Sequence, residues 1–155
     1  MADLKPQDRC NLRAVDLLCE LPLRVDVEIE LRRFGVMKRR ADGTLDFISP
    51  MPCPYNYGSI PGRMGGDGDP LDALVLGRRR KLGRYRGLHV LGVVDFVDAG
   101  AGDPKVICSF EPGELHPLQI RGLGRFFGLY ARFKTVLNHA RRLAGPTQLR
   151  GIVVR

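Results

Sequence analysis

The sequence has no long apolar run, no paired-cysteine motif and few aromatic residues. No apolar stretch approaches the roughly 20 residues that a membrane-spanning helix needs, and residues 1–24 carry charges throughout, without the apolar core of a signal peptide. We therefore expect a cytoplasmic chain with no membrane partner. Aromatic residues make up 7% of the chain, which argues against a stacking platform for single-stranded nucleic acid.

Several metal and nucleotide motifs are also missing. The four cysteines form no C-x-x-C pair, which argues against a zinc ribbon or a redox centre, so we expect reduced and mostly buried thiols. The three histidines are scattered without an H-E-x-x-H motif and are expected to be structural. The sequence contains no Walker A motif, no G-x-G-x-x-G and no G-x-S-x-G.

The bulk composition indicates one globular domain over residues 1–155, with 44% apolar and 27% charged residues. The net charge of +8 either attracts anions such as phosphates or simply keeps the protein in solution.

The hydrophobic pattern predicts a mainly β protein of the α+β class. Residues 24–31 alternate strictly between polar and apolar side chains, which is typical of a half-buried strand. Prolines and glycines between residues 50 and 68 predict a long loop. Further strands are expected at 34–39, 44–48, 73–76, 88–96, 105–110 and 148–154, a short helix at 12–19 and a long helix at 126–143. Short strands followed by one late helix favour a closed or partly closed barrel with a helix on its outside.

The most informative segment is Asp67-Gly68-Asp69-Pro70-Leu71-Asp72. A single aspartate is a common turn former, but a turn does not need three of them. Carboxylates packed this closely raise each other's pKa unless a cation lies between them, and a hard divalent ion is the simplest such cation. The segment does not match a calcium EF-hand, because position twelve from Asp67 is Arg78.

A second acidic cluster, Asp95, Asp98 and Asp103, follows about thirty residues later. Asp98 and Asp103 flank a glycine-containing turn between two predicted strands. If those strands pair with residues 73–76, both clusters face one cavity, and two or more Mg²⁺ or Mn²⁺ ions are then expected. Ligation by oxygen alone argues against zinc or iron. A pair of dications activates water for in-line displacement at phosphorus, and nearby basic side chains would neutralise substrate phosphates.

The aspartate motif, preceded by Tyr57 in Asn56-Tyr57-Gly58, resembles the signature of the Mg²⁺-dependent family I soluble inorganic pyrophosphatases. The resemblance covers residues 24–130. It implies a five-stranded OB-like closed barrel with flanking helices, hydrolysis of pyrophosphate to two phosphates, and homohexamers.

The resemblance also implies roles for the acidic residues. Asp67, Asp72 and Asp103 resemble ligands of the tighter metal, and Asp72 would also reach a second metal. Asp98 and Asp103 resemble ligands of a metal that arrives with the substrate. Asp69 resembles the base that deprotonates the attacking water.

Four further residues resemble substrate-binding groups of the family. Lys105 stands in the place of a phosphate-binding lysine, and Tyr57 and Tyr130 in the places of tyrosines that bind substrate or water. Glu28 resembles an active-site glutamate.

Many of the side chains that bind phosphate in this family are replaced in this sequence. Family positions for charged or phenolic side chains align with Gly35, Met37, Ser49, Cys53 and Ala131. Each lost charge-assisted contact would cost roughly 1.5–3 kcal/mol. The nearby basic residues that could compensate are Arg33, Lys38, Arg39 and Arg132. Two alternatives therefore stay open: a metal-dependent phosphohydrolase with another phosphate substrate, and a weakly active paralogue that serves as a binding module, for example for nucleic acid.

Overall fold

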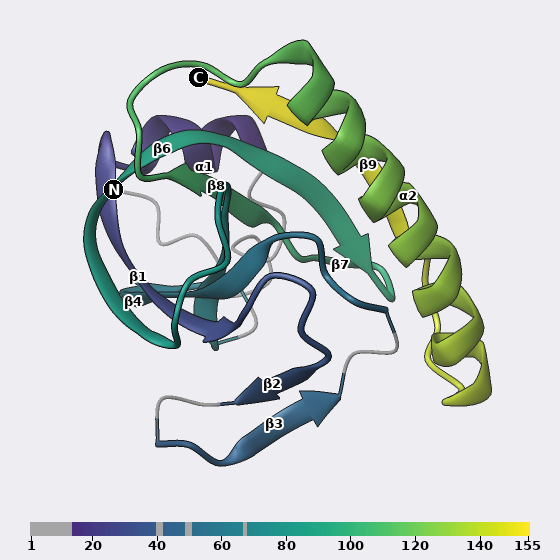
Figure 1. Cartoon of the computed structure of the whole chain (residues 1–155). Helices are drawn as coiled ribbons and strands as arrows, with labels where there is room; N and C mark the ends of the chain where they lie inside the picture. The colour runs from purple at the N-terminus through teal and green to yellow at the C-terminus, as the bar shows by residue number, and fades with distance from the viewer. Residues whose placement is uncertain (1–13, 40–41, 49–50, 67) are drawn as a thin grey trace, which may run out of the picture.

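The computed structural model describes residues 14–39, 42–48, 51–66 and 68–155 (Figure 1). The elements follow in the order α1 (Ala14–Glu20), β1 (Arg24–Leu31), β2 (Met37–Arg39), β3 (Leu45–Ile48), β4 (Asn56–Met64), β5 (Pro70–Val75), β6 (Gly83–Asp98), β7 (Ala101–Gly102), β8 (Lys105–Ser109), α2 (Pro117–Ala140) and β9 (Gln148–Val154). In this part of the chain, no helix is both long enough and apolar enough to cross a membrane.

The sheet closes into the expected five-stranded, OB-like barrel. Its strands follow the order β1-β4-β5-β8-β6, and β6 pairs back with β1. Only β5 and β8 run parallel; the other barrel pairs are antiparallel. β7 and β9 add to β6, and β2 and β3 form a separate two-stranded antiparallel sheet. The mainly β fold class predicted from the sequence is confirmed.

The strict alternation of β1 gives the barrel its inner wall. Val25, Val27, Ile29 and Leu31 are all buried, whereas the residues between them are partly exposed. Val25, Val27 and Ile29 join a core that includes Ala73, Val93 and Val106 from other strands. Because the polar residues of β1 are left on the other face, they can reach the surface of the barrel, where the candidate site lies.

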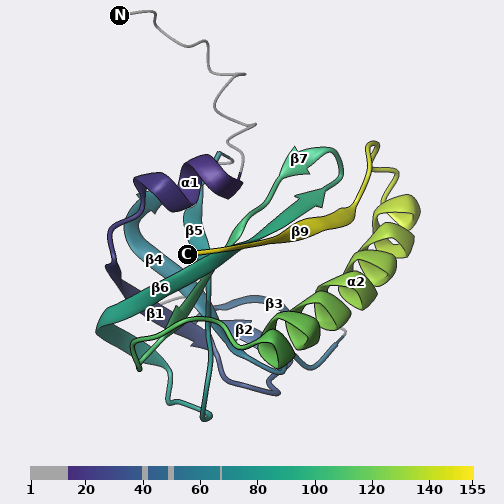
Figure 2. The same ribbon diagram turned by 90° about the horizontal axis from the view of Figure 1, so that it is seen from above.

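α2 covers the outside of the barrel beside β9, as Figures 1 and 2 both show. Leu123 and Phe127 pack into a second core with Leu74, Phe96 and Ile107. The helix starts nine residues before the predicted position 126, so that boundary was wrong.

The early start of α2 has a local cause. His116 caps it by accepting a hydrogen bond from the Leu118 amide, Gln119 completes the capping box, and Pro117 occupies the first turn. The cap and the buried face outweigh the helix-weakening glycines of residues 122–128.

The predicted loop over residues 50–68 was also wrong, because β4 occupies its centre and pairs with both β1 and β5. Glycine is required rather than disruptive there: a Cβ on Gly58 would lie 1.8 Å from the Glu28 carbonyl oxygen. The fully buried Asn56 anchors the start of β4, since its amide donates to the Val75 and Arg78 carbonyls and accepts from the Arg33 and Arg80 amides.

Candidate active site

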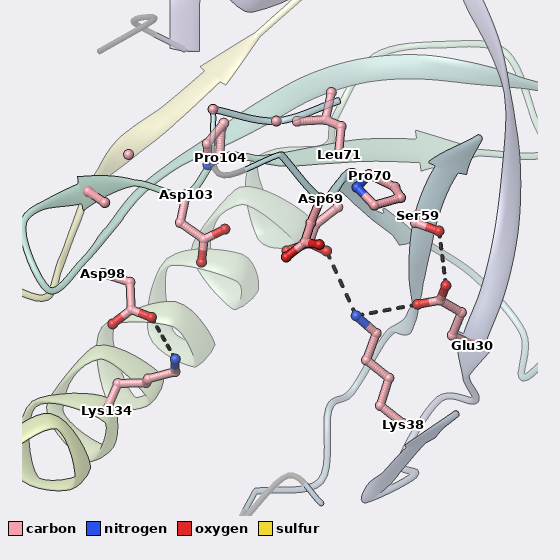
Figure 3. Close-up of a pocket in the computed structure, with 15 residues that line it drawn as sticks. Glu30, Lys38, Ser59, Asp69, Pro70, Leu71, Asp98, Asp103, Pro104 and Lys134 are labelled. Carbon is pink, nitrogen blue, oxygen red and sulfur yellow. Dashed lines mark hydrogen bonds and ion pairs between the residues drawn. The ribbon is translucent and has the colours of Figure 1, made fainter. Parts of the chain in front are cut away.

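The start of β5, the turn after β6, and side chains from β1, β2 and α2 surround a cavity of about 730 Å³ (Figure 3). Asp69 and Asp72 line it from the first acidic cluster, and Asp98 and Asp103 from the second. Asp67 lies outside the described residues. Asp95 lies elsewhere, where it forms an ion pair with Arg150 at 3.3 Å. The structure therefore brings together two clusters that are thirty residues apart in sequence.

Strand pairing explains this convergence. The parallel register of β5 and β8 sets Asp72 opposite Lys105. Asp98 ends β6, and the chain reverses through Ala99 and Gly100, both at positive φ. The Asp103 amide then donates to the Phe96 carbonyl at 2.8 Å, which returns Asp103 to the cavity.

Lys105 is the centre of the acidic site. Its Nζ lies 2.7 Å from Asp72 Oδ2 and 2.6 Å from Asp103 Oδ1, and its side chain is only 4% exposed. Burial alone would lower the pKa of Lys105, but the charges of Asp103 and Asp72 outweigh burial and raise it well above its usual value. Burial would likewise raise the pKa of Asp72, but Lys105 and Lys38 hold it below its usual value. Lys105 and Asp72 are therefore both charged at neutral pH.

The family resemblance implies that Glu28 is a site residue, but the residue that lines the cavity is Glu30, two residues further along β1. Its carboxylate accepts from Ser59 Oγ at 3.0 Å and lies 3.3 Å from Lys38 Nζ. Lys38 also lies 4.0 Å from Asp72 Oδ1. Glu28 pairs with Ser59 in the register of β1 and β4 and lines neither this cavity nor the one that adjoins it.

Asp98 is held from α2. Lys134 Nζ lies 2.6 Å from Asp98 Oδ2, and Asn138 Nδ2 donates to Asp98 Oδ1 at 2.7 Å. Burial alone would raise the pKa of Asp98, but these two bonds lower it. The acidic cluster and the helix are thus joined through one carboxylate.

A second cavity of about 390 Å³ adjoins the first and shares Asp72, Asp103, Lys38 and Lys134 with it. Its remaining lining consists of Lys105, Arg141, Tyr57, Tyr130, Phe133 and Leu137. Burial, and then the charge of Asp72, raises the pKa of Tyr57 well above its usual value, and burial raises that of Tyr130. Both phenols therefore stay protonated and can donate hydrogen bonds to an anion.

The donor set fits a hard divalent cation. The first cavity is lined by carboxylates of Glu30, Asp69, Asp72, Asp98 and Asp103, and these outnumber its ammonium groups even when Lys105 is counted. Oxygen donors of this kind suit Mg²⁺ or Mn²⁺. Within the described residues, no three acidic, histidine or cysteine side chains already form a metal site, since lysines hold several of the carboxylates. A cation would therefore exchange with ammonium groups.

The structure also places the positions where the sequence departs from the family. Met37 is half exposed, and its neighbour Lys38 reaches the cavity instead. Gly35 occupies a tight turn, where a Cβ would lie 2.8 Å from the Arg32 carbonyl oxygen. Cys53 and Ala131 are buried. Ser49 lies outside the described residues.

Of the basic residues considered as substitutes, Lys38 alone among those described reaches the cavities. Arg33 instead donates to the Gly77 carbonyl at 3.0 Å, and Arg132 is exposed on α2. The side chain of Arg39 is not described. Sequence reasoning missed Glu30, Lys134 and Arg141. Lys134 could have been found from its position four residues after Tyr130 on a predicted helix, because residues at this spacing share a helix face.

Comparisons with known proteins agree on one family. The inorganic pyrophosphatase family model matches residues 17–137. Soluble inorganic pyrophosphatase 3 of Arabidopsis thaliana is 30% identical over 131 residues, 73% of this chain and 61% of the relative. The soluble inorganic pyrophosphatase of Oryza sativa subsp. japonica is 31% identical over 125 residues, 73% of this chain and 56% of that protein. The chain thus spans about three fifths of these plant relatives.

Solved structures agree on the fold. The inorganic pyrophosphatase of Thermus thermophilus superposes with a TM-score of 0.70 at 23% identity, covering 95% of this chain and 90% of that one. A family match over most of the chain, together with the closed barrel and its converging carboxylates, shows that this chain belongs to the inorganic pyrophosphatase family.

Proposed function

We propose that this protein hydrolyses inorganic pyrophosphate to two phosphates with Mg²⁺, or Mn²⁺, as its cofactor. The observation that carries the proposal is the convergence of Asp69, Asp72, Asp98 and Asp103 on one cavity, beside a second cavity lined by lysines and tyrosines. A site that binds a diphosphate needs both cavities: carboxylates to hold the metal ions, and cationic or phenolic groups to bind the phosphate oxygens.

The acidic residues of the site have separate proposed roles. Asp72, Asp98 and Asp103 would hold the cations, with Asp67 predicted as a further ligand. When bound, the cations would lower the pKa of the attacking water and neutralise charge on the phosphates. Asp69 would accept the proton of that water, as the family resemblance implies.

The second cavity would bind the substrate's phosphate oxygens. Lys105 and Lys38 provide charge there, and the protonated Tyr57 and Tyr130 provide hydrogen bonds. Lys105 would move from its carboxylate partners towards the phosphate as cations take over Asp72 and Asp103.

Phosphate release from pyrophosphate tests the proposal. We expect Mg²⁺-dependent release by the wild type, and a loss of about 10²–10⁴-fold in kcat for Asp69→Asn, the range for removal of a general base. Asp95→Asn is the matched control, because Asp95 pairs with Arg150 outside the cavities. No release by the wild type, or activity unchanged in Asp69→Asn, would contradict the proposal.

One observation favours a second candidate substrate. Phe133 and Leu137 give the second cavity an apolar wall that pyrophosphate itself does not need. A phosphate ester or anhydride with an organic group, such as a nucleotide, could contact that wall. Initial rates on pyrophosphate, nucleoside triphosphates and polyphosphate separate the two candidates; a strong preference for pyrophosphate removes the second.

Self-association is part of the proposal. Leu129 and Val136 lie seven residues apart on the exposed side of α2, and Leu143 follows after seven more residues, beyond the end of the helix; each is more than half exposed. Such a row supports burial against another copy, and the family resemblance implies a hexamer. Light scattering coupled to size exclusion measures the mass; a monomer at all concentrations would contradict this part. The cytoplasmic location stays a prediction.

A further inference from the structure

The geometry points to Lys134 as a phosphate-binding residue that supplies, from α2, the positive charge that the family pattern places at position 131. This inference rests on the proposed function and names a specificity-determining residue within the same site. It starts from the observation that Lys134 lines both cavities.

The helix explains why position 134 can serve where position 131 cannot. Ala131 is 6% exposed and packs in the core beneath α2, so a long charged side chain there would disrupt that packing. Lys134 follows Tyr130 by four residues, so the two side chains share a face of α2. Both line the second cavity, together with Arg141 just beyond the end of the helix.

The charges of the second cavity favour an anion. Its described lining contains the cations Lys38, Lys105, Lys134 and Arg141, against the two carboxylates Asp72 and Asp103. Those two carboxylates are the groups that the proposed cations would take, which leaves the basic side chains to face the substrate. Lysine suits this task because its flexible stem lets the ammonium group follow a phosphate oxygen.

Lys134 can leave Asp98 without disordering it. Asn138, which is 4% exposed, donates to Asp98 Oδ1 at 2.7 Å and also lies 2.9 Å from Thr147 Oγ1. The Thr147 hydroxyl in turn accepts from the Ala99 amide at 3.0 Å, next to Asp98 in the chain. The position of Asp98 is thus fixed by a network that does not include Lys134. Once Asp98 serves a cation, the Lys134 ammonium is repelled and needs a new anion, which a substrate phosphate provides.

The test uses three variants and three measurements: diphosphate binding, phosphate-release kinetics, and Mg²⁺ affinity without diphosphate. Lys134→Gln removes the charge, Lys134→Arg keeps it, and Arg125→Gln removes a charge from an exposed position of α2 that lines neither cavity. Calorimetry with Mg²⁺ and imidodiphosphate, a non-hydrolysable diphosphate, measures binding without turnover. Phosphate-release kinetics give KM and kcat separately.

We expect Lys134→Gln to weaken imidodiphosphate binding and to raise KM by about tenfold or more, the scale of one charge-assisted contact. Lys134→Arg should stay within about threefold of the wild type, and Arg125→Gln should match it. Mg²⁺ affinity measured without diphosphate should not fall in Lys134→Gln, because Asn138 still holds Asp98.

Unchanged imidodiphosphate binding in a folded Lys134→Gln protein would overturn the inference and leave Lys134 as a counter-ion of Asp98. A fall in Mg²⁺ affinity without a change in diphosphate affinity at saturating Mg²⁺ would overturn it in the same way. If the wild type binds imidodiphosphate but releases no phosphate, the proposed function fails while the binding arm still decides the role of Lys134.

Discussion

Replacing Lys105 with methionine would expose how the acidic site is stabilised before any cation binds. Methionine nearly preserves the volume of the side chain and removes its charge. In the native protein the Lys105 ammonium lies 2.7 Å from Asp72 and 2.6 Å from Asp103, and its side chain is 4% exposed. The variant leaves two negative carboxylates facing each other across an apolar thioether.

The size of the effect follows from the geometry. Removing one partner of a buried ion pair costs about 3–5 kcal/mol. Because Asp72 and Asp103 are 22% and 31% exposed and can partly hydrate, we expect a loss near the lower end, about 3 kcal/mol. The contribution is fully present at neutral pH, since the pKa of Lys105 is raised and that of Asp72 is lowered. For a chain of this length, a loss of about 3 kcal/mol corresponds to a drop in Tm of about 6–12 °C.

Urea unfolding and thermal melts in EDTA measure this loss. Arg150→Met serves as the control, because its ion pair with Asp95 is more exposed and should contribute less than about 1 kcal/mol. Added Mg²⁺ should stabilise Lys105→Met more than the wild type, since in the variant no ammonium competes for the two carboxylates. A loss below about 1 kcal/mol in EDTA, or equal stabilisation of both proteins by Mg²⁺, would refute the reasoning.

Three further predictions concern acid stability, strand packing and thiol reactivity. Because the pKa of Asp98 is lowered in the folded protein, the charged carboxylate contributes stability above its unfolded-state pKa of about 3.9, and this contribution is lost as the pH falls through the folded-state pKa. Asp98→Asn should therefore destabilise the protein more at pH 7 than at pH 3. Equal losses of stability in urea titrations at both pH values would count against the Asp98 bonds. Gly58→Ala should lower Tm sharply or abolish soluble expression, since the new Cβ would lie 1.8 Å from the Glu28 carbonyl oxygen; a melt like that of the wild type would show that β1 and β4 can separate freely. Iodoacetamide at pH 8 should modify the exposed Cys19 before Cys108, whose pKa burial raises to about 12; peptide mass spectrometry gives the order, and faster labelling of Cys108 would contradict its burial.

The sequence predicted those elements whose pattern is local. The alternation of residues 24–31 predicted the limits of β1, because each apolar residue there is buried and each polar one is not. β4 escaped detection, since the need for glycine at position 58 arises from the carbonyl of a neighbouring strand and not from any local pattern. The start of α2 escaped because a cap on His116 and burial of Leu123 outweigh its glycines.

The site residues likewise divide into those that a local sequence pattern predicts and those that depend on tertiary packing. The acidic residues could be predicted because three of them crowd six residues of sequence, and the convergence of the two clusters followed from strand pairing. Lys134 could not be assigned, because its place depends on how α2 lies across the barrel. The choice of Glu30 over Glu28 depends on the register of β1 against β4, which alternation alone does not fix.

Anomalous diffraction from a crystal grown with Mn²⁺ and phosphate tests the central claim most directly. We expect at least two anomalous peaks inside the first cavity, with carboxylate oxygens of Asp72 and Asp103 at one and Asp98 within ligand distance of another. An empty cavity at saturating Mn²⁺, with Lys105 still bridging Asp72 and Asp103, would contradict it.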